Sequence, residues 1–236
     1  MEAKTMSSLP VGDFVPSVSE VHTPRRVDYE GEYIALSPLD SERDAPGLFA
    51  CSHGAELVEQ LWTYMAYGPF EDVSDLQAWL EGIEDSEDPL FLSVRDRVSD
   101  RPVGMVSFLN IAADARRLEL GNIWYGPEAQ NTCANTEAAY LMLCEAFDCM
   151  AYRRVEWKCD ALNERSRSAA LRLGFTYEGL FRQHMIVKDR NRDTTWFSML
   201  DTEWSRIKEN MEQWLYHNPD KSWSLREKNQ GLGGVR

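Results

Sequence analysis

The chain has 236 residues, and its 39 Asp and Glu against 25 Lys and Arg give a formal net charge of −14. Its apolar content of 43 % is enough to fill a hydrophobic core, which excludes extensive disorder. So acidic a chain repels phosphate backbones, which argues against nucleic acid as a partner and favours a cationic ligand.

Membrane, redox and metal signals are absent from the sequence. No apolar run reaches the length of a membrane span, and the first ten residues lack the pattern of a signal peptide. The five cysteines are odd in number and contain no C-x-x-C pair, which favours reduced thiols. The four histidines show no metal-ligand spacing. We therefore expect a cytoplasmic protein with no metal and no membrane partner.

Domain organisation is predicted from composition. Residues 1–27 mix Ser, Pro, Val and Gly without a period and are expected to form a flexible arm. Residues 218–236 are polar and Gly-rich and are expected to form a flexible tail. Residues 28–217 contain neither an internal repeat nor a linker, so a single domain is expected there.

The first half of this domain predicts strand, helices and a hairpin. A short strand at residues 33–36 ends at Pro38. Three helices follow, at residues 39–51, 55–65 and 73–83, the last with Asp72 or Ser74 as its N-cap. Strands at 90–94 and 103–110 flank a polar turn and form a hairpin.

The second half alternates strands and helices. The expected elements are, in order, a strand at 118–125, a buried helix at 138–150, a strand at 154–159, a helix at 164–173 between Asn163 and Gly174, strands at 175–187 and 193–200, and a helix at 202–216. This order predicts an α/β architecture with a mixed sheet, in which ligands bind where strands end and helices begin.

Charge is segregated along the chain. Residues 71–88 hold eight acidic side chains and no Lys or Arg, whereas residues 151–192 hold ten Lys and Arg against five Asp and Glu. Two solvated faces of opposite sign would explain this pattern. An anion-binding half that faces a cation-attracting half would explain it equally.

Two helix starts carry the functional signal. After the strand at 118–125, Gly126 and Pro127 open a loop of small and polar residues that leads into a helix. The free backbone N–H groups of such a helix start can bind a pyrophosphate. A second polar helix start follows at residues 160–166, so the two lie beside each other in the predicted sheet.

Together these segments resemble the GCN5-related N-acetyltransferase (GNAT) superfamily, in particular its ribosomal-protein (RimJ/RimL-type) branch. The resemblance covers roughly residues 33–204. Its marks are, in order, Gly126-Pro127, Gln130, Asn135-Thr136-Glu137-Ala138, Asn163 with Ser166, Leu173-Gly174-Phe175, Glu178-Gly179 and Arg192-Asp193-Thr194. It implies the GNAT fold, a mixed and mostly antiparallel central sheet flanked by helices, with splayed parallel strands that hold acetyl-CoA.

The resemblance also implies the contacts to acetyl-CoA. The cofactor-binding residues would be Ile123, Trp124, Tyr125, Gln130, Asn131, Thr132, Cys133, Ala134, Asn135, Thr136, Asn163 and Arg167. Family members have glycine where this chain has Cys133, and glycine or alanine where it has Asn135. Cys133 must therefore adopt an ordinary φ, while Asn135 tolerates a left-handed one. The lost glycines leave a second hypothesis open, a non-catalytic acyl-CoA-binding or interaction protein.

The resemblance implies acetyl transfer to a primary amine by direct attack in a ternary complex. Ser166 would be the acid that protonates the leaving thiolate, since Ala170 stands where many relatives have a Tyr. His184 and Glu119 are alternative bases, because Met185 occupies the position of the carboxylate used in the ribosomal branch. His184 could act there only if a bulge reverses its direction. An amine of low pKa would need no base.

Acceptor contacts are predicted from an aromatic run. Trp62, Tyr64 and Tyr67 would wall the acceptor pocket, as the corresponding loop does in relatives. The expected acceptor is a small amine or a peptide N-terminus of cationic character. The C-terminal helix with Trp204 and Trp214 is a candidate homodimer surface.

Overall fold

The structure, a computed structural model, describes residues 9–18, 20–54 and 60–230. Its elements are, in chain order, β1 (Tyr29–Glu30), β2 (Ile34–Pro38), α1 (Ser41–Ser52), η1 (Gln60–Tyr64), α3 (Val73–Glu81), β3 (Leu90–Asp96), β4 (Pro102–Ala112), η2 (Ala113–Ala115), β5 (Arg117–Tyr125), η3 (Pro127–Ala129), α4 (Ala134–Cys144), η4 (Glu145–Cys149), β6 (Arg154–Asp160), α5 (Glu164–Leu173), β7 (Thr176–Val187), β8 (Arg190–Leu200), α6 (Asp201–Tyr216) and α7 (Leu225–Gln230).

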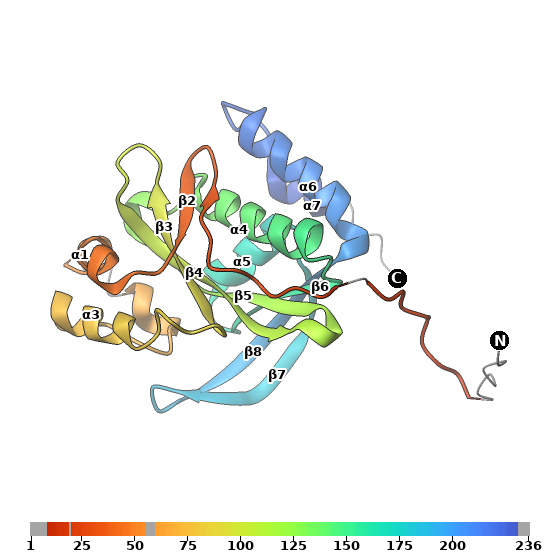
Figure 1. The fold of residues 1–236 in the computed structure, drawn as a ribbon, viewed down its shortest axis with the longest axis horizontal. Helices are drawn as coiled ribbons and strands as arrows, with labels where there is room; N and C mark the ends of the chain where they lie inside the picture. Colours follow the sequence, from red (N-terminus) through yellow and green to blue (C-terminus); the bar gives the residue numbers. More distant parts are fainter. Residues whose placement is uncertain (1–8, 19, 55–59, 231–236) are drawn as a thin grey trace.

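One sheet contains all eight of these strands, in the order β1-β2-β3-β4-β5-β6-β8-β7. Neighbouring strands are antiparallel except β5 and β6, which are parallel. Because parallel neighbours need a crossover, the chain between β5 and β6 forms helix α4. The predicted α/β class and the mixed, mostly antiparallel sheet are confirmed. Figure 1 shows α1 and α3 at one side of the sheet and α4, α5 and α6 at the other.

The sheet buries side chains on both of its faces. Leu90 and Leu92 belong to a large core with α4, α5 and α6, whereas Phe91 between them belongs to a second core with α1, η1 and α3. This division follows from the alternation of side chains along a strand. The second core is rich in rings, and Trp124 of β5 is part of it.

Helix ends follow the predicted capping residues. The side chain of Asn163 accepts a hydrogen bond from the backbone of Ser166 at the start of α5, and Gly174 ends that helix with a φ of 98°. Asp72, rather than Ser74, caps α3. These local signals explain why α5 spans the predicted residues 164–173.

Two helices differ from the prediction. Helix α4 begins at Ala134, four residues before the expected start, because the hydroxyl of Thr132 accepts a hydrogen bond from the Ala134 backbone. The predicted helix 55–65 falls partly outside the described residues, since 55–59 are not described. Its remainder forms the 3-10 helix η1.

Helix α4 is fixed to the start of β2 by Glu137. This carboxylate is fully buried and accepts hydrogen bonds from the backbone N–H groups of Glu32, Tyr33 and Ile34, each at 2.8 Å. The hydroxyl of Tyr216 in α6 donates a fourth bond to it at 3.0 Å. Four donors satisfy the buried charge and hold three elements together.

Residues 218–230, expected to belong to a flexible tail, instead end in helix α7. Leu225 lies in the large core, and Asn229 donates a hydrogen bond to the backbone oxygen of Arg172 in α5. Arm residues 9–17 are mostly exposed and extend away from the sheet (Figure 1). The arm makes contact nearer the domain, where the Tyr152 hydroxyl donates to the His22 oxygen.

Candidate active site

Strands β5 and β6 separate after a short parallel ladder. Their pairing runs from Arg117 with Arg154 to Glu119 with Glu156 and ends there. Beyond this point β5 continues beside β4, and β6 continues beside β8. An opening therefore lies between the C-terminal halves of the two strands, which lead into α4 and α5. We call it the strand opening.

A bulge in β5 borders this opening. Trp124 pairs with Met105 and Gly121 with Ser107, so that Asn122 and Ile123 face the single residue Val106. Asn122 has a φ of 52°, and its amide donates to the Ser107 hydroxyl at 2.9 Å. A bulge leaves backbone groups without partners in the neighbouring strand. Main-chain N–H groups of β5 can thus bind a carbonyl oxygen here.

The predicted contacts from Ile123, Trp124 and Tyr125 must come from the main chain. The side chain of Trp124 lies in the second core and that of Tyr125 in the large core. Ile123 is half-buried and packs against the large core.

The β5–α4 loop (residues 126–133) leads to the start of α4. Gln130 holds it by donating to the Tyr125 oxygen at 2.8 Å, and Thr132 donates to the Ala129 oxygen at 2.7 Å. Cys133 has an ordinary φ of −70°, and the left-handed residue is Asn131, with a φ of 60°. The conformation therefore requires no glycine at 133, and the expected left-handed position at Asn135 lies inside α4 instead.

Two predicted contacts lie within the first turn of α4. Thr136 is buried and accepts a hydrogen bond from Arg172 of α5 at 2.6 Å. The side-chain oxygen of Asn135 is buried without a hydrogen-bond partner among the described residues. The free N–H groups of this helix start remain suited to phosphate.

The start of α5 brings Ser166 next to β6. The Ser166 hydroxyl accepts a hydrogen bond from the Trp157 indole at 3.0 Å. Asn163 acts as the N-cap, as its position predicts. Its contact with acetyl-CoA stays a prediction. Arg167 pairs with Glu164 and also donates to the Ala161 oxygen. These contacts hold the Arg167 guanidinium at the start of α5, while its buried Nε atom has no hydrogen-bond partner among the described residues.

Glu119 lies on the sheet face that carries the second core. It is 5 % exposed, and its Oε2 atom accepts from Lys158 Nζ at 2.8 Å and from the Asn110 amide at 2.7 Å. Lys158 also lies 3.3 Å from Glu156 and 3.9 Å from the centre of the Trp196 ring. Burial raises the pKa of Glu119, while Lys158 and Asn110 act in the opposite direction.

His184 lies on the same face because a bulge reverses its direction. Phe181 pairs with Thr194 and Met185 with Arg192, so three residues of β7 face one of β8, and Gln183 has a φ of 50°. His184 Nδ1 lies 3.0 Å from the Thr194 hydroxyl. Its ring meets the Trp196 ring edge-on, with centroids 6.0 Å apart. Trp196 thus lies between His184 and Lys158.

The aromatic run before α3, which contains Trp62, Tyr64 and Tyr67, borders the sheet face that carries Glu119. We call it the aromatic wall. The Tyr64 hydroxyl donates to the Leu162 oxygen before α5, and Lys188 of the β7–β8 turn donates to the Trp62 oxygen at 2.9 Å. Trp62 itself is 1 % exposed, and its indole donates to the Ser52 oxygen. Its burial in the second core removes Trp62 from the predicted substrate contacts.

Tyr67 is the third predicted acceptor contact. Its ring stacks on Trp79, and its hydroxyl is buried without a hydrogen-bond partner among the described residues. Burial raises its pKa, so the hydroxyl stays protonated. Of the three predicted acceptor contacts, Tyr64 is the one whose hydroxyl bonds to the segment before α5.

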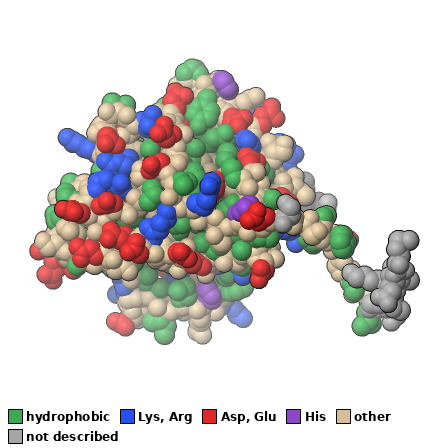
Figure 2. All heavy atoms as spheres, in the orientation of Figure 1, with side chains coloured by type: hydrophobic (Ala, Val, Ile, Leu, Met, Phe, Trp, Pro, Cys, Tyr) green, Lys and Arg blue, Asp and Glu red, His purple; other side chains and the backbone are tan. Residues whose placement is uncertain are grey.

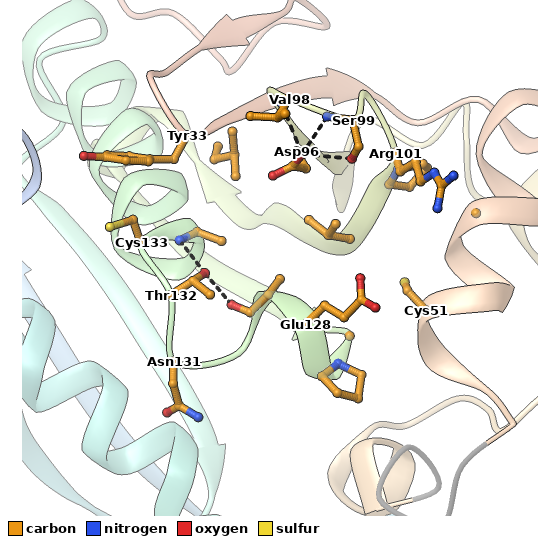
Figure 3. A pocket seen from close by; sticks show the side chains of 18 of the residues that line it. Tyr33, Cys51, Asp96, Val98, Ser99, Arg101, Glu128, Asn131, Thr132 and Cys133 are labelled. Carbon is orange, nitrogen blue, oxygen red and sulfur yellow. Dashed lines mark hydrogen bonds between the residues drawn. The ribbon is translucent and has the colours of Figure 1, made fainter.

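A separate cavity of about 1140 Å³ lies beside the β5–α4 loop. In Figure 3, Tyr33, Thr132 and Cys133 stand on one side of it, and Cys51 and Arg101 on the other. Its lining includes Asn131 and Ala134 but neither Asn163 nor any residue of β6. The cavity therefore lies on the β2–β4 side of the loop, away from the strand opening.

The missed members of the site are Asn110, Lys158 and Trp196. Each lies on a strand, on the face that Glu119 shares. The alternation of Glu156 and Lys158 on one face of β6 was a usable signal, because β6 follows β5 in the predicted crossover.

Comparison with known proteins decides the family. A family model described as an acetyltransferase (GNAT) domain matches residues 34–176. The chain belongs to the GNAT family. A crystal structure of a GCN5-related N-acetyltransferase from Brucella melitensis is 38 % identical, covers 89 % of this chain and 97 % of its own, and has a TM-score of 0.85.

Two further proteins are similar to this GNAT chain. A probable GNAT acetyltransferase from Chromobacterium violaceum is 35 % identical over 84 % of this chain and 100 % of its own, with a TM-score of 0.75. YdaF of Bacillus subtilis (strain 168), proposed to be a ribosomal N-acetyltransferase, is 31 % identical over 101 residues. That match spans 43 % of this chain and 55 % of YdaF. The resemblance to the ribosomal branch is confirmed.

Membership supports acetyl transfer as the general chemistry. GNAT proteins transfer acetyl groups from acetyl-CoA, so the chain belongs to a family of acetyltransferases. Within the described ranges, none of the helices has both the length and the apolar character of a membrane span. The same ranges contain no cluster of three or more His, Cys, Asp or Glu side chains that could hold a metal ion.

Proposed function

We propose that the protein is an acetyl-CoA-dependent N-acetyltransferase that acts on a primary amine by direct attack in a ternary complex. The observation that carries the proposal is the strand opening, which the β5 bulge borders and whose two strands lead into the starts of α4 and α5. A thioester needs a donor to its carbonyl oxygen, a free amine and an acid for the leaving sulfur. Each has a candidate at this opening.

The residues present fit acetyl-CoA. The β5–α4 loop and the first turn of α4 offer N–H groups to a pyrophosphate, and no acidic side chain precedes Glu137 in that helix. Bound acetyl-CoA would supply an activated acetyl group. Backbone groups near Asn122 would then bind its carbonyl oxygen, and Ser166 would hold the proton for the leaving sulfur.

Glu119 is the base we favour over His184. A base must take a proton from an ammonium group, and a carboxylate with its burial holds that proton at higher pH than an exposed one. His184 lies on the exposed β7 beyond Trp196, farther from the β5–β6 ladder. Glu119 belongs to that ladder itself.

The acceptor we propose is a cationic small amine or a peptide N-terminus. Its support is the acidic segment 71–88, which includes α3 beside the aromatic wall. Figure 2 shows Asp and Glu side chains gathered at the side of the molecule that carries α1 and α3. An electric field of this sign concentrates cationic ligands. YdaF, proposed to be a ribosomal N-acetyltransferase, supports the peptide alternative.

Calorimetry with acetyl-CoA, followed by a free-thiol release assay, tests the function. The panel contains spermidine, lysine ethyl ester and short peptides with free Ser, Ala or Met N-termini. We expect micromolar binding and thiol release with at least one amine. Binding without release would favour the non-catalytic hypothesis, whereas absence of binding would contradict the proposed enzyme.

A further inference from the structure

Glu119 has one charged partner. Among the described residues the cation in contact with it is Lys158, and its other polar partner is the neutral amide of Asn110. Glu156, the neighbouring carboxylate, differs because it also has Arg154 at 2.9 Å and Arg117 at 3.8 Å. The charge of Glu119 therefore depends on Lys158 in a way that the charge of Glu156 does not.

Lys158 is held in place by its surroundings. Its side chain is 12 % exposed, and the Trp196 ring of β8 covers it at 3.9 Å. From the remaining packed elements, the groups that face this pair are Asn110 on β4, Arg117 on β5, Glu156 on β6 and His184 beyond Trp196 on β7. An ammonium this confined remains beside Glu119 rather than moving into solvent.

We propose that Lys158 is a positioning residue, which keeps Glu119 ionised and aimed from β5 so that this carboxylate can accept the proton of the acceptor ammonium. This inference rests on the proposed function. The proton moves from R–NH3⁺ to the carboxylate, which leaves R–NH2 and a neutral carboxylic acid, and no other bond changes in this step.

The sign of the effect follows from burial. Without a cation nearby, a buried carboxyl group takes up its proton at higher pH, because burial favours the neutral form. Replacing Lys158 by Met therefore raises the pH at which Glu119 becomes ionised. A charge within 4 Å commonly moves such a pKa by roughly 1 to 3 units. Transfer would be lost at the acidic end of the profile and regained as the pH rises.

The kinetic test compares Lys158→Met and Lys158→Arg with the unaltered full chain. The readout is the pH dependence of kcat/KM with acetyl-CoA and the best amine of the panel. We expect the acidic limb to move up by roughly 1 to 3 pH units in Lys158→Met and to stay near its place in Lys158→Arg. Lys208→Met is the control, because Lys208 of α6 pairs with Asp148 of η4, outside this network.

A second measurement does not depend on turnover. Carbon-13 NMR follows the titration of labelled Glu carboxyl groups, with Glu119 assigned from Glu119→Gln. We expect the Glu119 titration to move upward in Lys158→Met. An unmoved titration would overturn the inference, and so would a moved titration with an unmoved kinetic limb. Lack of transfer by the unaltered chain would instead contradict the proposed function, while NMR still tests the pair.

The double variant Glu119→Gln/Lys158→Met guards against misfolding. It removes both charges, so no buried charge is left unpaired. We expect it to fold and to match Glu119→Gln in its pH profile. A further change of profile on adding Lys158→Met to Glu119→Gln would show that Lys158 acts elsewhere and would overturn the inference.

Discussion

The contacts of the Ser166 hydroxyl determine which hydrogen bonds it can still make. A hydroxyl has one hydrogen to donate and two lone pairs. The Trp157 indole donates to one lone pair, and the Ser166 hydroxyl also lies within hydrogen-bond reach of the Cys159 thiol. Two side chains of β6 thus position Ser166, and its hydrogen would have to leave the Cys159 thiol to protonate a leaving sulfur.

Replacement of Ser166 by Ala is expected to lower kcat by roughly 100-fold, because a general acid is lost. The affinity for acetyl-CoA should change by no more than about twofold, since the hydroxyl acts on the leaving group. Thiol release and calorimetry measure the two effects. Ser168→Ala, an exposed serine of the same helix, is the control. Equal losses in both variants would contradict the assignment.

The β5–α4 loop shows how an element tolerates missing glycines. Its left-handed position is Asn131, and asparagine adopts that conformation more readily than other residues with a side chain. Cys133 lies at an ordinary φ, so a glycine there would relieve no strain. The departure from the family pattern is therefore compatible with the loop's shape.

A β-branched residue at position 131 should disrupt the loop. We expect Asn131→Val to destabilise the fold by about 1–2 kcal/mol and to weaken acetyl-CoA binding, whereas Asn131→Gly should be nearly neutral. Urea unfolding and calorimetry provide the measurements. If the valine variant were as stable as the glycine variant, the positive φ at 131 would not constrain the loop.

At the scale of the whole molecule, the C-terminal segment completes the large core. Leu225 is 2 % exposed, and Asn229 of the same short helix bonds to both Asn210 and the Arg172 backbone. Trp204, expected on a dimer surface, is buried and donates to Asp148 at 2.8 Å. Helix α6 thus packs Trp204 inward. Helix α7 packs against both α5 and α6.

Truncation of Leu225 tests this closure. Leu225→Ala is expected to lower the free energy of unfolding by about 2–4 kcal/mol, because it removes buried methyl groups and leaves a cavity. Leu162→Ala makes the same change at a side chain that is 74 % exposed and should cost less than about 0.5 kcal/mol. Similar values for both would mean that α7 adds little to the core.

Local signals explain what could be predicted. The caps at Asn163 and Gly174 and the polar loop after β5 act within a few residues, so the sequence alone identifies α5, the loop and the family marks. From the sequence, a bulge at His184 could be stated only as a requirement for His184 to act as the base. It depends on how β7 registers against β8.

The sequence by itself determined the order of elements, the acidic charge and the resemblance to GNAT proteins. Tertiary structure alone decided that Lys158 pairs with Glu119, that Trp62 is buried and that α7 joins the core. Each of these depends on contacts between segments far apart in the chain. Strand order and register set such contacts, and neither is fixed by the propensities of neighbouring residues.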